Sequence, residues 1–224
     1  MLSESDMKRL GDVLGNIKGD TKLAFSHQIE DVILLDMLAK LGILPHIMVF
    51  TLDTHKLFEQ SLAHQREVER HFGIEILRYC ASSEELEAVE REIGDWGMRE
   101  SLEKRKKCCF VRKILPLRRA LEGASAWISG IRAAQSMTRA HVGLVEDDAQ
   151  FGLQKINPLF DWDDAKVWEY ASAHDLPKNP LYAQGFASIG CAPCTRAIEP
   201  GESIRAGRWW WEDPAHKECG LHRR

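Results

Sequence analysis

The cysteines of this chain fall into a pattern that could bind a metal. Cys108 and Cys109 are adjacent, and two residues separate Cys191 from Cys194 in the sequence Cys-Ala-Pro-Cys. Four thiolates from two distant pairs can form a tetrahedral sulfur site for an iron–sulfur cluster or for zinc. Paired zinc ligands are usually separated by about two to four residues, so the adjacent pair fits zinc less well. Four buried, unconnected thiols are the alternative.

A fifth cysteine lies near the end of the sequence, in Glu218-Cys219-Gly220-Leu221-His222. Its thiolate, beside the His222 imidazole, could act as a nucleophile, and Gly220 allows the backbone to approach a site closely. The alternative is a surface cysteine in a frayed terminus. Together with the two pairs, this motif indicates a redox enzyme whose reactive sulfur is separate from its metal site.

Basic residues surround the adjacent pair and recur later in the chain. Arg112 and Lys113, which follow the pair, could offset anionic thiolates or hold an anionic substrate. We interpret most of the run from 104 to 107 as a solvated charged face. Other arginines could bind sulfate or phosphate through planar guanidinium groups, although each alone could equally be a surface residue. They are Arg132, Arg139, Arg205 and Arg208.

Two segments near the N-terminus could bind a nucleotide. The sequence Ser26-His27-Gln28 joins the first predicted strand to a helix, where backbone amides and the helix dipole can bind phosphate. Asp53 and Thr54 end the second predicted strand, where a ribose or adenine would lie. Taken alone, these two residues could equally form a turn.

The composition limits the class of protein. With 224 residues and a net charge of −4, the chain can bury a full core and has no overall basic character that would favour nucleic acid. No apolar run approaches the roughly 20 residues that span a bilayer, and the acidic N-terminus is unlike a signal peptide. We therefore expect a cytoplasmic protein with reduced cysteines and neither a membrane nor a nucleic-acid partner. Assembly into a homo-oligomer stays open.

Strand and helix patterns alternate along most of the chain. Strands are predicted over 21–25, 46–51, 74–79, 126–131, 140–145 and 153–156. Helices are predicted over 2–18, 30–41, 56–72, from a capping box at Ser82 to Ile93, over 114–121, and over 163–174 with Asp161 as its cap. This order predicts an α/β fold with a parallel sheet flanked by helices and ligands at the carboxyl ends of its strands. Residues 1–176 would form this domain, and 177–224 an irregular segment that returns to the active face.

The combined motifs resemble those of the assimilatory adenylyl-sulfate reductases, within the adenylyl-sulfate/phosphoadenylyl-sulfate (APS/PAPS) reductase family. The resemblance covers nearly all of the chain after residue 20. It rests on Cys108-Cys109 with Arg112-Lys113, the stretch 127–139, Cys191-Ala-Pro-Cys194, the stretch 205–211 and the motif 218–222.

The resemblance implies an adenine nucleotide alpha-hydrolase-like fold, related to the ATP pyrophosphatases, and a [4Fe-4S] cluster on the two cysteine pairs. It implies that Cys219 attacks the sulfur of adenylyl sulfate, that AMP leaves, and that thioredoxin or a similar dithiol protein releases sulfite from the thiosulfonate. It also implies roles for other residues. Lys113, Arg205, Arg208 and His222 match active-site positions, Arg132 and Arg139 would be further anion contacts, and Ser26, Asp53 and Thr54 match the nucleotide motifs.

Two residues depart from the family pattern, and three other functions stay open. Gln28 lies near a usual glycine of the phosphate loop, and His55 follows Asp53-Thr54 where glycine is common. Both bear on nucleotide recognition, so phosphoadenylyl sulfate or both nucleotides could be the substrate. An ATP-dependent thiolation or amidation enzyme would need a glycine-rich loop that the chain lacks. A zinc-stapled nucleic-acid-binding module would use the basic run and would not need Cys219.

Overall fold

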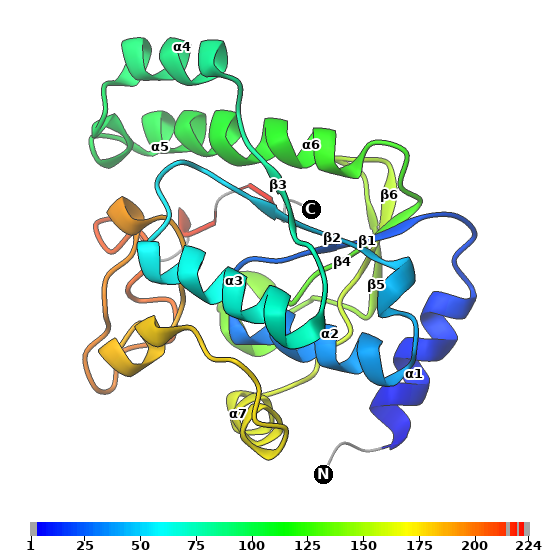
Figure 1. Cartoon of the computed structure of the whole chain (residues 1–224). Coiled ribbons are helices and arrows are strands. Elements are labelled where there is room, and N and C mark those ends of the chain that lie inside the picture. Colours follow the sequence, from blue (N-terminus) through cyan, green and yellow to red (C-terminus); the bar gives the residue numbers. More distant parts are fainter. Residues whose placement is uncertain (1–3, 214–215, 219, 222–224) are drawn as a thin grey trace.

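A six-stranded sheet forms the centre of the protein (Figure 1). The computed structural model describes residues 4–213, 216–218, 220 and 221. The strand order is β3-β2-β1-β4-β6-β5, and β5 pairs antiparallel with β6 while the other neighbours are parallel. The predicted α/β fold is thus confirmed, with one antiparallel edge. The strands are β1 (Thr21–Ala24), β2 (Met48–Leu52), β3 (Leu77–Tyr79), β4 (Ala126–Ile128), β5 (Val145–Asp148) and β6 (Leu153–Ile156).

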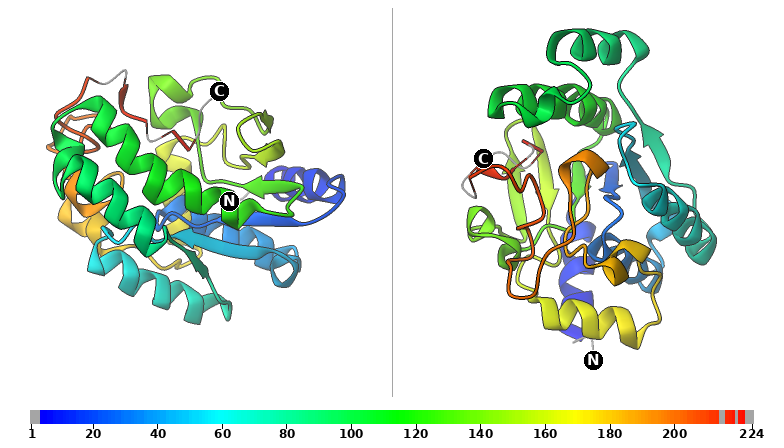
Figure 2. Two further views of the ribbon diagram at one scale, coloured as in Figure 1. Left: turned by 90° about the horizontal axis from the view of Figure 1, so that it is seen from above. Right: turned by 90° about the vertical axis from the view of Figure 1, so that its left-hand side faces the viewer.

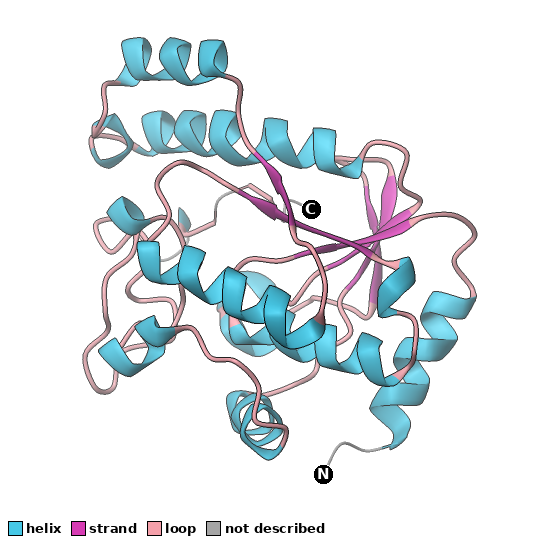
Figure 3. Ribbon diagram, in the orientation of Figure 1, coloured by secondary structure: helices cyan, strands magenta, loops and turns pink. Residues whose placement is uncertain are grey.

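Helices cover both faces of this sheet (Figure 3). One face packs against helices that include α2, which also contacts α3 and α7. The other face packs against α6, which lies on β2 and β3. The helices are α1 (Glu4–Gly15), α2 (Ile29–Lys40), α3 (Glu59–Phe72), α4 (Ser83–Ile93), α5 (Leu102–Cys109), α6 (Leu115–Leu121) and α7 (Asp164–Ala173). None of the helices in the part of the chain that the structure describes is long and apolar enough to cross a membrane.

The alternation of side chains along the central strands explains the two layers. Leu23 and Val49 point into the core shared with α2, whereas Phe50 points into the core shared with α6. On β4, Ile128 and Trp127 divide in the same way. Because successive residues of a strand face opposite sides, each strand contributes to both cores. The sheet is therefore buried on both faces, as the apolar strands predict.

A continuous helical segment carries Cys108 and Cys109 and the basic residues Arg112 and Lys113 that follow them. Helix α5 ends at Cys109, a π-helix spans Phe110–Ile114, and α6 follows directly. Short π-helical turns inside α-helices often occur at functional sites. The sequence predicted α6 from residue 114 but missed α5, because the charged sequence of α5 has little apolar periodicity. The start of α5 is fixed by Ser101, whose side chain accepts a hydrogen bond from the Lys104 amide at 3.2 Å.

Two other local predictions are wrong. Residues 140–145 do not form a strand: a 3-10 turn occupies Met137–Arg139, and the edge strand begins only at Val145. Asp161 does not cap α7; the cap is Asp163, which accepts a hydrogen bond from the Lys166 amide, and Asp161 instead pairs with Arg9 at 2.7 Å. In both places a contact distant in sequence or a better-placed neighbour overrides the local pattern. The capping box of Ser82 and Glu85 is confirmed.

We expect acid to destabilise the fold through a buried histidine of α3. His64 is buried, neither ring nitrogen has a hydrogen-bond partner, and burial lowers its pKa to about 4 from 6.5. Between these pH values the unfolded chain binds a proton that the folded protein does not, so stability falls as the pH falls through this window. His64→Leu should remove about 2–3 kcal/mol of the loss between pH 7 and pH 4.

Urea denaturation at several pH values would measure this difference. His71→Leu is the matched control, because His71 lies in the same helix and is exposed. Equal pH dependence of unfolding in the wild type and His64→Leu would contradict the assignment.

Candidate active site

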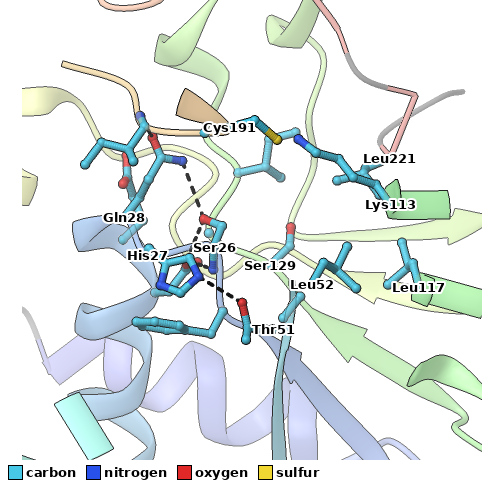
Figure 4. Close-up of a pocket in the computed structure, with 18 of the residues that line it drawn as sticks. Ser26, His27, Gln28, Thr51, Leu52, Lys113, Leu117, Ser129, Cys191 and Leu221 are labelled. Atoms are coloured by element: carbon cyan, nitrogen blue, oxygen red, sulfur yellow. Dashed lines mark hydrogen bonds between the residues drawn. The ribbon is translucent and has the colours of Figure 1, made fainter. Parts of the chain in front are cut away.

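A cavity at the carboxyl ends of β1, β2 and β4 gathers most of the predicted binding residues (Figure 4). The C-terminal part of the chain crosses the same end of the sheet (Figures 1 and 2). This arrangement is the one expected for a parallel α/β sheet, where ligands bind beyond the carboxyl ends of the strands. The cavity is lined by the predicted residues Ser26, Thr54, Lys113, Arg139, Cys191, Arg205 and Arg208, and by Leu221 of the tail.

The loop after β1 is held by a buried carboxyl group. Both the amide and the hydroxyl of Ser26 donate to the Asp31 side chain, each at 2.6 Å. Burial raises the pKa of Asp31 to about 7, although the bonds from Ser26 oppose the shift. His27 takes a positive φ of 66° and its Nε2 lies 3.1 Å from the hydroxyl of Thr51. The Ser26 amide, expected to meet phosphate, is therefore already engaged by Asp31.

Gln28, one of the two departures from the family pattern, connects this loop to the C-terminal segment. Its Oε1 accepts hydrogen bonds from the amide of Ile189 at 3.0 Å and from the hydroxyl of Ser188 at 3.3 Å. Arg208 reaches the same segment, donating to the Ile189 carbonyl at 2.9 Å. A glycine at position 28 could not make these bonds. The glutamine therefore fixes the chain shortly before Cys191.

Thr54, which follows β2, contacts the first cysteine of the second pair. The Thr54 hydroxyl lies 3.2 Å from the sulfur of Cys191, and the Thr54 carbonyl accepts from Arg112 at 2.9 Å. Asp53 does not line the cavity; its side chain accepts the amide of His55 at 2.9 Å and forms a turn. Of the predicted pair, Thr54 therefore faces the site and links the nucleotide side to the cysteines.

The four paired cysteines lie together at one end of the protein. Cys108 and Cys109 close α5, and Cys191 and Cys194 flank a short 3-10 turn at Ala192–Cys194. All four are buried, unbridged and packed in one cluster around a small cavity. Their grouping around one cavity is the arrangement that a shared site would require. Within the described residues, no group of three or more His, Cys, Asp or Glu side chains is arranged to hold a single metal ion.

Lys113 lies in the wall between this cysteine cavity and the larger one. It lines both cavities, as do Cys191 and Trp209. Figure 4 shows its amino group directed toward the sulfur of Cys191. Burial opposes ionisation of the Cys191 thiol, but the charge of Lys113 and the hydrogen bond of Thr54 help to lower its pKa. Lys113 is thus placed to stabilise negative charge both on the cysteines and on an anionic ligand in the larger cavity.

The predicted arginines divide into three groups. Arg208 is buried and packs so closely against Gly190 that a Cβ there would meet its Nη2 at 2.3 Å. Arg139 and Arg205 line the larger cavity and pair with Glu218 of the tail. Arg132 does not line it; its guanidinium is bound by Glu30, Asp164 and a backbone carbonyl.

The prediction also missed a residue. Arg105, assigned to the solvated run, is completely buried and stacks over the Trp209 ring at 4.6 Å. Its neighbours Lys104, which is half-buried, and Lys107, which is exposed, pair instead with surface glutamates. Composition could not separate Arg105 from them, because the distinction depends on which side of α5 faces the tail. The predicted nucleophile Cys219 and its neighbour His222 lie outside the described residues.

Comparison with solved structures defines the class of fold. The phosphoadenylyl-sulfate (PAPS) reductase of Candida auris, solved as a phosphate complex, superposes with a TM-score of 0.67, at 25% identity over 84% of this chain and 88% of that one. The FMN adenylyltransferase of Candida glabrata superposes with a TM-score of 0.56, at 14% identity over 89% of this chain and 68% of that one. The protein therefore has the adenine nucleotide alpha-hydrolase type of fold that the motifs predicted.

Sequence comparison then gives the family. The phosphoadenosine phosphosulfate reductase domain matches residues 21–197, so the chain belongs to this family. A relative from Allochromatium vinosum named adenosine 5'-phosphosulfate reductase is 50% identical over 87% of this chain and 75% of its own length. Another of that name, from Neisseria meningitidis serogroup A, is 42% identical over 99% of this chain and 90% of its own length. The predicted family is confirmed.

Proposed function

We propose that this protein reduces adenylyl sulfate to sulfite and AMP in assimilatory sulfate reduction. The observation that carries the proposal is the shared position of Lys113 and Cys191, which line both the cysteine cavity and the arginine-lined cavity. In this position the Lys113 cation lies where it could contact the sulfate of a nucleotide bound at the carboxyl ends of the strands. The relatives named adenosine 5'-phosphosulfate reductase support the choice of substrate.

In the proposed reaction the Cys219 thiolate attacks the sulfur of the sulfate group. A sulfur–sulfur bond forms, the bond from that sulfur to the bridging phosphate oxygen breaks, and AMP leaves with the bonding electron pair. A dithiol protein such as thioredoxin then attacks the Cys219 sulfur. Sulfite leaves, and the second thiol of the donor resolves the mixed disulfide, so the donor supplies two electrons. Arg139, Arg205, Arg208 and Lys113 would bind the anionic groups, and His222 would accompany the nucleophile.

We further propose that the four paired cysteines hold a [4Fe-4S] cluster. The donor set fits: four buried thiols from two segments surround one cavity, with the cationic groups of Arg105, Arg112 and Lys113 around it. A zinc site would need several of these sulfurs to converge on a single ion. When bound, the cluster would supply charge that acts with Lys113 in orienting the sulfate. Thr54 and Arg112 would hold the Cys191 side of the site in place.

Incubation of anaerobically purified protein with adenylyl sulfate, without reductant, tests this function. Intact mass spectrometry followed by peptide mapping should find a sulfonate on Cys219, and thioredoxin should release it as sulfite. A parallel incubation with phosphoadenylyl sulfate separates the two nucleotides. An adduct from phosphoadenylyl sulfate alone would overturn the proposed substrate, and no adduct from either nucleotide would overturn the reaction.

Lys113→Ala should slow the reaction while leaving the metal site filled. Loss of a charge-assisted contact to the sulfate should lower kcat/KM by about 10- to 100-fold. Iron content and the visible spectrum should match the wild type, because Lys113 supplies none of the proposed ligands. Lys107→Ala is the control, since Lys107 is exposed and pairs with Glu92. Unchanged kinetics in Lys113→Ala would remove Lys113 from the active site.

A further inference from the structure

Three arginines from separate parts of the chain converge on the residues just before Cys219. Arg105 comes from α5, and it donates to the backbone carbonyls of His216 and Glu218, both at 2.8 Å. Its Nε also donates to the side chain of Glu212 at 2.6 Å. The Arg105 side chain is 0% exposed. A fully buried guanidinium that is held by a carboxylate and two tail carbonyls fixes the backbone at this point.

Arg139 and Arg205 hold the tail through the Glu218 side chain. Arg139 makes a bidentate contact, with Nε to Oε1 at 2.9 Å and Nη2 to Oε2 at 3.0 Å. Arg205 lies 3.3 Å from Oε2 and also donates to the carbonyl of Lys217 at 2.8 Å. Burial opposes ionisation of Glu218, but the hydrogen bond and charge of Arg139 and the charge of Arg205 outweigh it and lower its pKa to about 2. Glu218 is therefore a carboxylate at neutral pH.

The same groups connect the tail with both cavities. Arg139 and Arg205 line the larger cavity, where an anionic ligand would meet them. Arg105 lines the smaller cavity with the four paired cysteines, and it precedes Cys108 and Cys109 on α5. The Glu218 carboxylate thus already occupies arginines that face the larger cavity. An anionic substrate that uses these arginines must share them with Glu218 or displace it.

We propose that Arg105, Arg139, Arg205 and Glu218 form a clamp that positions the tail for attack, and that Glu218 competes with the substrate for Arg139 and Arg205. This inference rests on the proposed function for its catalytic consequence, but the docking of the tail can be measured without it. Arg105 and Glu218 hold the tail without contacting the reacting atoms and act as positioning residues, whereas Arg139 and Arg205 would also bind the substrate. The competition makes substrate binding and tail docking mutually weakening.

Glu218→Gln tests the competition, because it removes the charge and keeps the shape of the side chain. The first-order rate of sulfonation at saturating adenylyl sulfate should fall about tenfold, since charge-assisted bonds to the tail are lost. The concentration of adenylyl sulfate at half-maximal rate should fall as well, because Arg139 and Arg205 no longer pair with a carboxylate. A structural defect alone would not lower this concentration.

Glu92→Gln is the matched control, because Glu92 is exposed and pairs with Lys107 at the surface. The proposal would be overturned if Glu218→Gln had the same rate and the same half-saturating concentration as the wild type. A raised half-saturating concentration would overturn the competition. If the wild type forms no sulfonate adduct, the proposed function fails, and the clamp is then judged by the second experiment.

Limited trypsin digestion tests the docking directly. Lys217 is a trypsin site within the clamp, and its carbonyl is bound by Arg205. Arg105→Met should increase cleavage after Lys217 at least about tenfold, and Arg105→Lys should restore part of the protection. Lys107→Met, at an exposed position of the same helix, should cleave like the wild type. Iron content and circular dichroism would identify a variant that has lost its fold, and equal cleavage in folded Arg105→Met would overturn the clamp.

Discussion

Cys219→Ser is expected to abolish sulfite formation without preventing substrate binding. A serine hydroxyl is not ionised near neutral pH, whereas a cysteine thiol readily supplies a thiolate, so the substitution removes the nucleophile. Turnover should fall at least about a thousandfold. Because the arginines and Lys113 are untouched, the affinity for AMP measured by calorimetry should stay within about twofold. No sulfonate should appear in the intact mass after incubation with adenylyl sulfate.

Cys80→Ser is the control for this variant. Cys80 is exposed and belongs to neither cysteine pair, so its loss should change neither turnover nor adduct formation. Retained sulfite production in Cys219→Ser would refute the assignment of the nucleophile. An adduct that maps to Cys80 in the wild type would do the same.

Cys194→Ser is expected to abolish both metal binding and sulfite formation. The Cys194 thiol is buried beside Cys191, and burial and the neighbouring thiol raise its pKa to about 11. A hydroxyl is a poor ligand for iron, so the variant should fall well below the about four irons per chain of a [4Fe-4S] protein. The visible absorbance of the wild type should disappear, and sulfite formation should fall with it.

The change should also loosen the C-terminal segment. The Cys194 carbonyl accepts the amide of Trp209 at 3.0 Å, and Trp209 packs among the four cysteines. Faster proteolysis after residue 195 would follow loss of this packing. Cys80→Ser again serves as the control for iron content. Full iron content in Cys194→Ser would contradict the proposed ligand set, whereas zinc in place of iron in the wild type would favour a structural metal site.

The sequence predicted the fold well because the strands are strongly apolar and alternate with helices. All of the strands except the antiparallel edge were found, since β1, β2 and β4 are buried on both faces and read as short apolar runs. The edge strand Val145–Asp148 was displaced from its predicted place because three of its four residues are acidic. Helix α5 was missed for a similar reason, because its run of charged residues gives it little apolar periodicity.

The sequence by itself determined the family of this protein and the reaction expected of it. The types and spacing of the cysteines, with Arg112, Lys113 and the motif around Cys219, are covalent facts that led to the family and to an expected reaction at sulfur. These inferences needed no knowledge of the packing, because ligand preference and nucleophilicity belong to the residue types.

Only the tertiary structure decided which residues share a site. Arg132 and Arg139 are equally good candidates in the sequence, but one is bound by Glu30 and Asp164 while the other lines the cavity. Arg105 is one cation in a charged run, yet it alone of that run is fully buried against the tail. The physical reason is that a guanidinium must be paired once it is buried, and the partners that pair it come from distant segments. Their meeting is a property of the fold.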